Sequence, residues 1–386
     1  MHWALPAVLA ALVAAGAADE TTWLNRGLVS AGSATRVQHF LAKARRGEPV
    51  TVSVIGGSIT AGAKASRGEL CYGALVAKWV GAAFPQSKVT FVNAGIGATG
   101  SGYGALRAQR DLLGHKPDLV VVEYAVNDPD NQQAAETLEG LLRQILGQPQ
   151  QPAVMLLFMM NQAGGNAQKW HSKVGEHYEL PMLSYRDALW PAMVAKEIAW
   201  TDFSPDEVHP NDRGHAFAAR LVTDYLDRAR AALPADDRLS PIAPQLPAPL
   251  LSATWDHCWL SEYADLKPVA NHGFTYQTGR IGDAGWRAEE PGSSLEFEVH
   301  GTVLYLMDWR LRGSNGKLSV QVDDRAPSIH DTWFPGTWGG YHGLIELARD
   351  LPPGAHRVHI EVLAGKNPDS TGHQITIQGL GAAGVE

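Results

Sequence analysis

Apolar and polar positions follow two different patterns along this chain, and the pattern changes near residue 250. Before that point, short and continuously apolar runs predict strands over 50–55, 88–92, 118–123, 153–159 and 181–185. Strands that are apolar on both faces are typical of parallel sheets covered by helices. The first part of the chain is therefore predicted to be a doubly wound α/β three-layer sandwich around a parallel sheet.

The segments between these runs have helical spacing. They predict helices over 71–84, 103–113 and 132–146, and a last helix that begins near Asn211 and ends before Pro234. The basic segment 43–46 is interpreted as the final turn of another helix, where cations suit the dipole. The last helix has an apolar stripe, formed by Phe217, Leu221, Val222, Tyr225 and Leu226.

After residue 250, apolar and polar residues alternate one by one. This alternation is found in five short runs, over 294–299, 303–306, 317–322, 356–362 and 374–377. Turn-forming segments rich in glycine and proline separate the runs. Such a pattern predicts an antiparallel β-sandwich, of jelly-roll-like type.

Four parts of the chain follow from these patterns. Residues 1–18 are predicted to be a signal peptide, because a short apolar run is followed by small residues, although no Lys or Arg precedes the run. Residues 30–233 form the α/β domain, 234–250 a stiff linker with five prolines, and 251–386 the sandwich. We expect a secreted protein, extracellular or periplasmic, with no integral membrane segment after signal removal.

Charge and cysteine content narrow the options further. The 386 residues carry a formal net charge of −8 and no long Lys/Arg run, which argues against a nucleic-acid partner. The two cysteines, Cys71 and Cys258, could pair in an oxidising compartment or could be two separate small apolar residues. Nothing in the local sequence decides between these alternatives.

Polar side chains with catalytic potential follow several of the predicted strands. Ser58 follows the first strand, the glycine-rich segment 93–100 the second, and Asn127 the third, while Asp206 and His209 precede the last helix. Ligands of open α/β sheets bind beyond the carboxyl ends of the strands. Each residue alone has a plainer reading, such as a turn or cap residue. Their conjunction predicts a hydrolytic site.

Four sequence blocks carry a specific resemblance. They are Gly56-Gly57-Ser58-Ile59-Thr60-Ala61-Gly62, Asn93-Ala94-Gly95-Ile96-Gly97-Ala98-Thr99-Gly100, Tyr124-Ala125-Val126-Asn127-Asp128 and Asp206-Glu207-Val208-His209-Pro210. Over about residues 50 to 230 the chain resembles the SGNH (GDSL-type) hydrolase superfamily, whose domain is a flavodoxin-like three-layer sandwich. The ordinary α/β-hydrolase fold is the rival, but its Gly-x-Ser-x-Gly elbow fails here at Thr60.

The resemblance implies a role for each matched residue. Ser58 would be the nucleophile and His209 its base, with Asp206 orienting the base and Glu207 as the competing acid. The oxyanion would be bound by the backbone N–H of Ser58, the Asn127 amide and a loop N–H that aligns with Ala98. His215 is interpreted as structural.

The chain departs from the family pattern at two positions. Gly57 stands where the family often has aspartate, and we expect little loss from this change. Ala98 stands where the family has its donor glycine, and a positive φ there would strain an alanine. Gly97 or Gly95 are the alternative donors.

The sandwich contains half of the twelve tryptophans of the chain. Most are expected in its core, but Trp333, Trp338 and Tyr341 lie in a turn-rich loop that could stack on sugar rings. An SGNH domain joined to a sandwich resembles secreted carbohydrate esterases that remove acetyl groups, which makes an acetylated saccharide the expected substrate. A lipase or lysophospholipase and a catalytically silent carbohydrate-binding protein are the alternatives. No metal or organic cofactor is implied.

Overall fold

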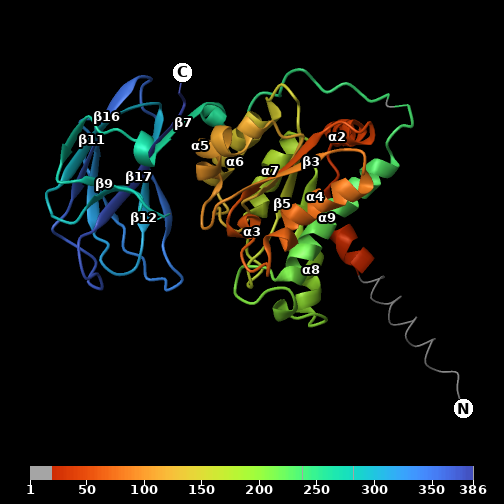
Figure 1. The fold of residues 1–386 in the computed structure, drawn as a ribbon, viewed down its shortest axis with the longest axis horizontal. Helices are drawn as coiled ribbons and strands as arrows, with labels where there is room; N and C mark the ends of the chain where they lie inside the picture. Colours follow the sequence, from red (N-terminus) through yellow and green to blue (C-terminus); the bar gives the residue numbers. More distant parts are fainter. Residues whose placement is uncertain (1–19, 237, 281, 386) are drawn as a thin grey trace, which may run out of the picture. The chain divides into compact units, whose positions relative to one another are not determined.

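The computed structural model describes residues 20–236, 238–280 and 282–385. The signal peptide predicted over 1–18 lies outside the described residues. The chain forms two compact units (Figure 1). Of the described residues, the first unit comprises those over 20–101, 110–138 and 145–250, and the second comprises those over 102–109, 139–144 and 251–385.

The first unit is built on a six-stranded sheet with the order β1-β6-β5-β4-β2-β3. Its strands are β1 (Leu28–Ser30), β2 (Val50–Gly56), β3 (Val89–Gly95), β4 (Leu119–Glu123), β5 (Ala153–Phe158) and β6 (Met182–Ser184). The strands β2 to β6 pair in parallel, whereas β1 pairs with β6 in the antiparallel direction. The five strands predicted from apolar runs are β2 to β6, and the parallel sheet is confirmed.

Helices alternate with these strands along the chain (Figure 1), and two of them have their middle residues, 102–109 and 139–144, in the second unit. The helices are α2 (Thr35–Arg45), α3 (Ser58–Ala61), α4 (Tyr72–Ala83), α5 (Ser101–Asp111), α6 (Gln132–Leu146), α7 (Gln168–His177), α8 (Tyr185–Val194) and α9 (Asp212–Ala231). The helices α2, α4, α8 and α9 share one apolar core with alternate strand residues such as Val52, Val54 and Val121. Because neighbouring strand residues point to opposite faces, the intervening ones face the helices on the other side.

Several elements are absent from the sequence prediction. The strand β1 has three half-buried residues, which is too few for a recognisable alternation. The helix α7 buries Gln168 and His171 beside Val174, so its inner face does not look apolar. The helix α8 contains Pro191, which argues against a helix when only the sequence is read.

The proline-rich segment 234–250 lies along the first unit instead of being free of contacts. His39 Nε2 donates a hydrogen bond to Ser240 O at 2.9 Å, and His177 Nε2 donates one to Ala248 O at 2.8 Å. Arg45 donates to Pro234 O. Backbone carbonyls of this segment therefore accept hydrogen bonds at three points, and its described residues form no helix or strand of their own.

The second unit contains two antiparallel sheets, as predicted for a β-sandwich. One has the order β15-β12-β17-β10-β9 with β7 paired to β17, and the other has the order β14-β13-β16-β11-β8. The strands are β7 (Cys258–Glu262), β8 (Ala270–His272), β9 (Thr275–Gln277), β10 (Gly285–Ala288), β11 (Ser294–His300), β12 (Val303–Arg310), β13 (Lys317–Val322), β14 (Ser328–Asp331), β15 (Tyr341–Ala348), β16 (Ala355–Val362) and β17 (Ile375–Ala383). Their inward-facing residues, among them Leu295, Leu306 and Ile360, form one core.

Both cysteines are free thiols. Cys71 is buried at the start of α4, and Cys258 Sγ lies 3.4 Å from Trp255 O at the start of β7. The disulfide that the sequence left open is thus not formed in this structure. Among the described residues, no helix combines the length and apolar character needed to cross a membrane.

Candidate active site

Ser58 begins the short helix α3 directly after β2 ends at Gly56. Gly56 is required by close packing, because a Cβ there would lie 2.2 Å from Thr60 Oγ1. The helix ends at Gly62, whose φ of +95° suits only glycine. The sequence thus forms a tight strand-to-helix turn that places the Ser58 side chain beyond the carboxyl end of the sheet.

Asp206, His209 and Ser58 form a continuous chain of hydrogen bonds. The His209 Nδ1–H donates to Asp206 Oδ2 at 3.0 Å, and His209 Nε2 lies 2.9 Å from Ser58 Oγ. With the proton on Nδ1, the Nε2 lone pair faces the Ser58 hydroxyl. Asp206 and His209 lie 148 and 151 positions after Ser58 in the sequence, and the fold brings the three side chains together. Their order, acid then base then nucleophile, is the one that proton removal from a serine requires.

The Asp206 carboxylate is held in its ionised form. Burial alone would raise its pKa, but the backbone N–H groups of His209 and Val208 donate to Oδ1 at 2.7 and 2.9 Å. These bonds and the His209 ring lower the pKa below its ordinary value. Lys64 Nζ lies 3.9 Å from Asp206 Oδ2 and adds a nearby positive charge.

The backbone of the Asp206 segment is anchored from behind. Trp200 Nε1 donates to Asp206 O at 2.6 Å, and the buried Ser204 hydroxyl lies 2.8 Å from Asp206 O and 2.6 Å from His209 O. Gln162 N donates to the carbonyl of Glu207 at 2.8 Å. The Glu207 side chain is exposed and makes no hydrogen bond to His209, so Asp206 occupies the position of the acid.

The segment 93–100 lies beside the nucleophile turn. Asn93 Nδ2 donates to Thr60 O at 2.8 Å, and Ile96 N donates to Gly56 O at 3.0 Å. A Cβ added to Gly97 would stand 3.8 Å from the Cβ of Ser58, so this backbone borders Ser58 directly. Gly95 needs to be glycine, because its Cβ would meet Ala61 N at 2.3 Å.

Ala98 adopts the left-handed conformation that the sequence analysis identified as unfavourable. Its φ is +56°. For a residue with a Cβ this conformation costs about 1–2 kcal/mol. The Thr99 hydroxyl donates to Ile96 O at 2.7 Å and closes the loop around this residue. Backbone strain is therefore concentrated beside Ser58.

Asn127 packs against the backbone of Gly57. A Cβ added to Gly57 would lie 2.1 Å from Asn127 Oδ1, so any larger residue would collide with this amide. Asn127 Oδ1 is buried without a hydrogen-bond partner in the described residues. In this chain the glycine at position 57 therefore makes room for the Asn127 amide.

Comparisons with known proteins place the chain among esterases. The model of the GDSL-like lipase/acylhydrolase family matches residues 54–217. Two solved structures of a two-domain esterase active on acetylated mannans, one of them co-crystallized with mannopentaose, are 30% identical to the chain with a TM-score of 0.86. The alignments cover 94% of this chain and 98% and 99% of theirs. No curated protein sequence matches.

The chain belongs to the GDSL-like lipase/acylhydrolase family. It is a carboxylic ester hydrolase, and the resemblance predicted from the four sequence blocks is confirmed. The alternative of a catalytically silent carbohydrate-binding protein is set aside.

Two further residues support the site of this esterase and were not singled out from the sequence. Asp128 Oδ1 accepts from Ser101 N at 2.8 Å, and His171 Nε2 lies 3.2 Å from Asp128 Oδ2, with both side chains buried. Asp128 therefore joins the end of the segment 93–100 to α7. Its place next to Asn127 was a usable signal, whereas nothing in the sequence near His171 indicated a role.

His215 has no contact with the catalytic residues through a hydrogen bond. Its Nε2 donates to Ala63 O at 3.1 Å, and its Nδ1 accepts from Tyr72 N at 3.4 Å. Burial lowers the pKa of this imidazole, which favours the neutral ring that both bonds require. The ring connects α9 to the segment after the nucleophile helix.

Only part of the predicted sugar-binding set comes together. Trp338 and Tyr341 lie 5.7 Å apart between ring centroids, and Phe334, which the sequence analysis missed, lies within 5.0 Å of both. Trp338 is 63% exposed. Trp333 is not part of this cluster, and its indole Nε1 is buried without a partner in the described residues.

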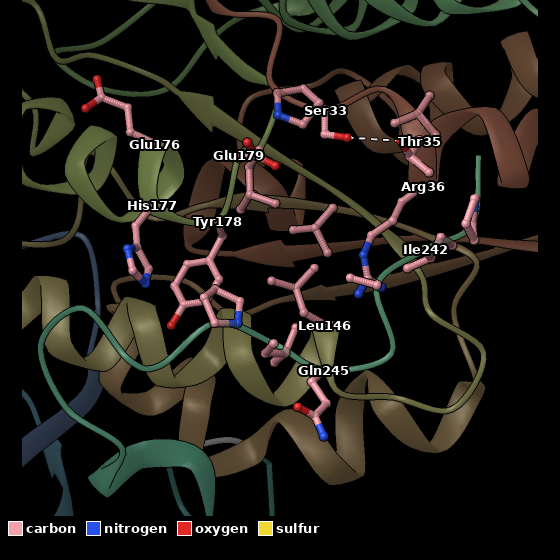
Figure 2. A pocket seen from close by; sticks show the side chains of 18 residues that line it. Ser33, Thr35, Arg36, Leu146, Glu176, His177, Tyr178, Glu179, Ile242 and Gln245 are labelled. Atoms are coloured by element: carbon pink, nitrogen blue, oxygen red, sulfur yellow. Dashed lines mark hydrogen bonds between the residues drawn. The ribbon is translucent and has the colours of Figure 1, made fainter. Parts of the chain in front are cut away.

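A cavity in the first unit lies away from the catalytic residues (Figure 2). It has a volume of about 820 Å³ and is lined by α2, by 176–181 and by the proline-rich segment. Arg36, Tyr178 and Gln245 are among the side chains that line it (Figure 2). Val154 and Pro181 place it near the amino ends of β5 and β6, whereas Ser58 follows the carboxyl end of β2. Among the described residues, no group of three or more His, Cys, Asp and Glu side chains could hold a metal ion.

Proposed function

We propose that this enzyme is a secreted serine esterase that removes acetyl groups from a carbohydrate through an acyl-enzyme intermediate. The observation that carries the catalytic part is the hydrogen-bond chain from Asp206 through His209 to Ser58, with distances of 3.0 and 2.9 Å. Each link has the donor and acceptor that the mechanism needs, because an ionised Asp206 keeps the His209 proton on Nδ1.

The proposed reaction has two halves. His209 Nε2 takes the Ser58 proton while Oγ attacks the ester carbonyl, and His209 then gives the proton to the leaving alcohol. The sugar hydroxyl leaves and an acetyl-serine remains. In the second half, His209 takes a proton from water while the water oxygen attacks the acetyl-serine carbonyl. The bond to Ser58 Oγ then breaks, His209 returns the proton to Oγ, and acetate leaves.

The developing oxyanion would be bound by three donors. The Ser58 N–H stands at the amino end of α3, and the Asn127 amide is packed against Gly57. The third donor comes from the backbone of Gly97 or Ala98, since this stretch borders Ser58. Each donor contributes roughly 3–4 kcal/mol to transition-state stabilisation in comparable sites.

The substrate class is inferred from similarity and from small side chains near Ser58. The similar two-domain esterase, aligned over nearly the whole of both chains, is active on acetylated mannans. Ala61 and Ala98 flank the nucleophile turn and the neighbouring loop, which suits a small acyl group. We therefore place acetylated mannan-type saccharides first among the substrates to test.

The cluster of Phe334, Trp338 and Tyr341 is proposed as a sugar-stacking surface of the second unit. Its support is the exposure of Trp338 and the mutual contacts of the three rings. A Trp338→Ala variant should bind mannan oligosaccharides less tightly but hydrolyse p-nitrophenyl acetate at the wild-type rate. Trp259→Ala, which removes another exposed indole outside the cluster, is the matched control. Equal binding by the Trp338 variant and the wild type would reject this surface.

Secretion is proposed from the apolar run and the small residues of 1–18 alone. Expression of the full chain, followed by amino-terminal sequencing of the exported protein, tests it. Export with a new terminus near residue 19 is expected, and retention of an intact terminus inside the cell would reject it.

A comparison of hydrolysis rates on different esters tests which acyl group the enzyme prefers. Acetate release from acetylated mannan oligosaccharides, acetylated xylan oligosaccharides and p-nitrophenyl acetate should exceed the hydrolysis of p-nitrophenyl palmitate. Preference for palmitate would favour the lipase or lysophospholipase alternative over deacetylation.

A further inference from the structure

A buried carboxyl group lies beneath the nucleophile helix, and the reaction proposed above does not use it. Glu123 is the last residue of β4 and is fully buried. It is in register with Gly56 on β2, the residue that immediately precedes the nucleophile turn. Because Glu123 has the same parity along β4 as Leu119 and Val121, its side chain points to the face that also holds α4.

The Glu123 carboxyl adjoins a pair of hydroxyl groups that belongs to the nucleophile turn. Thr60, which lies two residues after Ser58 in α3, is 2.9 Å from the Tyr72 hydroxyl of α4. The Thr60 hydroxyl and the Val126 N–H lie near enough to lower the pKa of this carboxyl. Neither carboxyl oxygen, however, has a partner at good hydrogen-bond geometry within the described residues.

Within the part of the chain that the structure describes, no positively charged side chain is among the groups that affect the pKa of this carboxyl. The groups that interact with it are Tyr72 from α4 and Asp128 from the segment after β4, and α3, β2 and β5 contribute no titratable side chain. Tyr124 and Cys71 lie near Tyr72. Both side chains are neutral when protonated and negative when ionised, so neither supplies a positive charge. His215, stacked on Tyr72, is kept neutral by burial.

The energetic consequence is a carboxyl that is neutral at pH 7. Burial raises the pKa of Glu123 from 4.5 to about 8, and the Asp128 charge adds to the rise. As a neutral acid, Glu123 carries an O–H beside the hydroxyl pair of Thr60 and Tyr72. As an anion, it loses that donor and becomes an isolated buried charge, which the surrounding structure accommodates only by moving.

We propose that protonated Glu123 is a positioning residue for Ser58, and that its ionisation displaces α3 and switches the esterase off at alkaline pH. In this proposal α3 is held by the hydrogen bond from Asn93 Nδ2 to Thr60 O and by the packing of a neutral Glu123 carboxyl beside the Thr60 side chain. The inference rests on the proposed role of Ser58 in the reaction.

The test is the pH dependence of kcat and KM for p-nitrophenyl acetate in the wild type, Glu123→Gln and Glu123→Ala. Wild-type kcat should fall about tenfold between pH 7 and pH 9, with KM little changed, because about one tenth of the carboxyl stays protonated one pH unit above its pKa. Glu123→Gln has a neutral amide donor, so it should retain kcat within about threefold at pH 7 and lose the alkaline decline. Glu123→Ala should be more than tenfold slower at both pH values.

Two further measurements separate this role from simple stabilisation. The infrared carbonyl band of a buried protonated acid should be present in the wild type, fade above pH 8 and be absent from Glu123→Gln. Near-ultraviolet circular dichroism should show a folded wild type at pH 9.

An alkaline decline that persists in Glu123→Gln would overturn the proposal, and so would global unfolding of the wild type at the pH of inactivation. A Ser58→Ala variant with undiminished turnover would instead reject the proposed function itself.

Discussion

Replacement of Gly57 by alanine tests how the oxyanion site is built. A Cβ at position 57 would lie 2.1 Å from Asn127 Oδ1, whereas real Cβ atoms essentially never approach a heavy atom closer than 3.0 Å. Gly57 has a φ of −86°, so the substitution brings no left-handed strain of its own. The collision therefore has to be relieved by a shift of roughly 1 Å, carried by the Asn127 amide, by the nucleophile turn, or by both.

The expected magnitude follows from the geometry of oxyanion stabilisation. Donors act at about 2.7–3.1 Å from the oxyanion, so a shift of about 1 Å removes most of one hydrogen bond. Loss of a single donor lowers kcat by about 10²–10³, which corresponds to roughly 3–4 kcal/mol. Gly57→Ala should therefore reduce kcat for p-nitrophenyl acetate by this factor and leave KM nearly unchanged.

A double-mutant cycle with Asn127→Ala isolates the contact. Each single variant should lose about 10²–10³ in kcat, and the double variant should be no slower than either, since both changes remove the same donor. Gly68→Ala is the control, because nothing lies within 4 Å of a Cβ at that position. Wild-type activity of Gly57→Ala, or losses that multiply in the double variant, would refute the reasoning.

Three further predictions concern the support of the site. Trp200→Phe removes the 2.6 Å bond to Asp206 O and should lower kcat about fivefold, as expected for roughly 1 kcal/mol, with an unchanged rate contradicting the anchoring role. Ala98→Gly should keep kcat/KM within about twofold. It should change the free energy of unfolding by less than about 1 kcal/mol, because the relief of backbone strain offsets the greater flexibility of glycine in the unfolded chain. Ala98→Val should have a kcat/KM at least tenfold lower than the wild type. The pKa of His215 is lowered in the folded state, so the contribution of the neutral ring to stability is complete above about pH 6.5 and is lost as the pH falls below that value. The free energy of unfolding in urea should therefore change less between pH 7 and pH 5 in His215→Gln than in the wild type. Equal changes in the two proteins would exclude this role.

The fold of this esterase was largely predictable because its strands carry the signal. In β4 and β5 each residue is buried, and continuous apolar runs marked both strands. The helix α6 matches its prediction over Gln132–Leu146, since its apolar residues recur at helical spacing. In contrast, α7 buries polar residues and β1 has only three residues, so neither has a periodic pattern of its own.

The residues of the site were predictable where a motif contained them. Ser58, Asp206 and His209 were named from their blocks, and the structure brings them within hydrogen-bonding distance. Residues that act through tertiary contacts were not predictable. Glu123 looks like the polar end of a strand in the sequence, and Trp200 approaches Asp206 only because a turn after α8 directs its indole toward that carbonyl.

Conformation also escaped prediction at two loop positions. The sequence left open whether Ala98 has a negative or a positive φ, and the value of +56° is set by the closed loop between Asn93 and Gly100. The need for glycine at position 57 arises from Asn127, which is 70 residues later in the chain. Contacts of this kind depend on the packing of loops from different strands, which local sequence patterns do not encode.

Hydrolysis of p-nitrophenyl acetate by the wild type and by Ser58→Ala tests the central claim most directly. The account predicts turnover by the wild type and a loss of roughly 10⁴–10⁶-fold in the variant, because the acyl-enzyme cannot form without the Ser58 hydroxyl. Circular dichroism and thermal unfolding should show that both proteins are folded. Undiminished turnover by Ser58→Ala, or no turnover by the folded wild type, would contradict the assignment of this chain as a serine esterase.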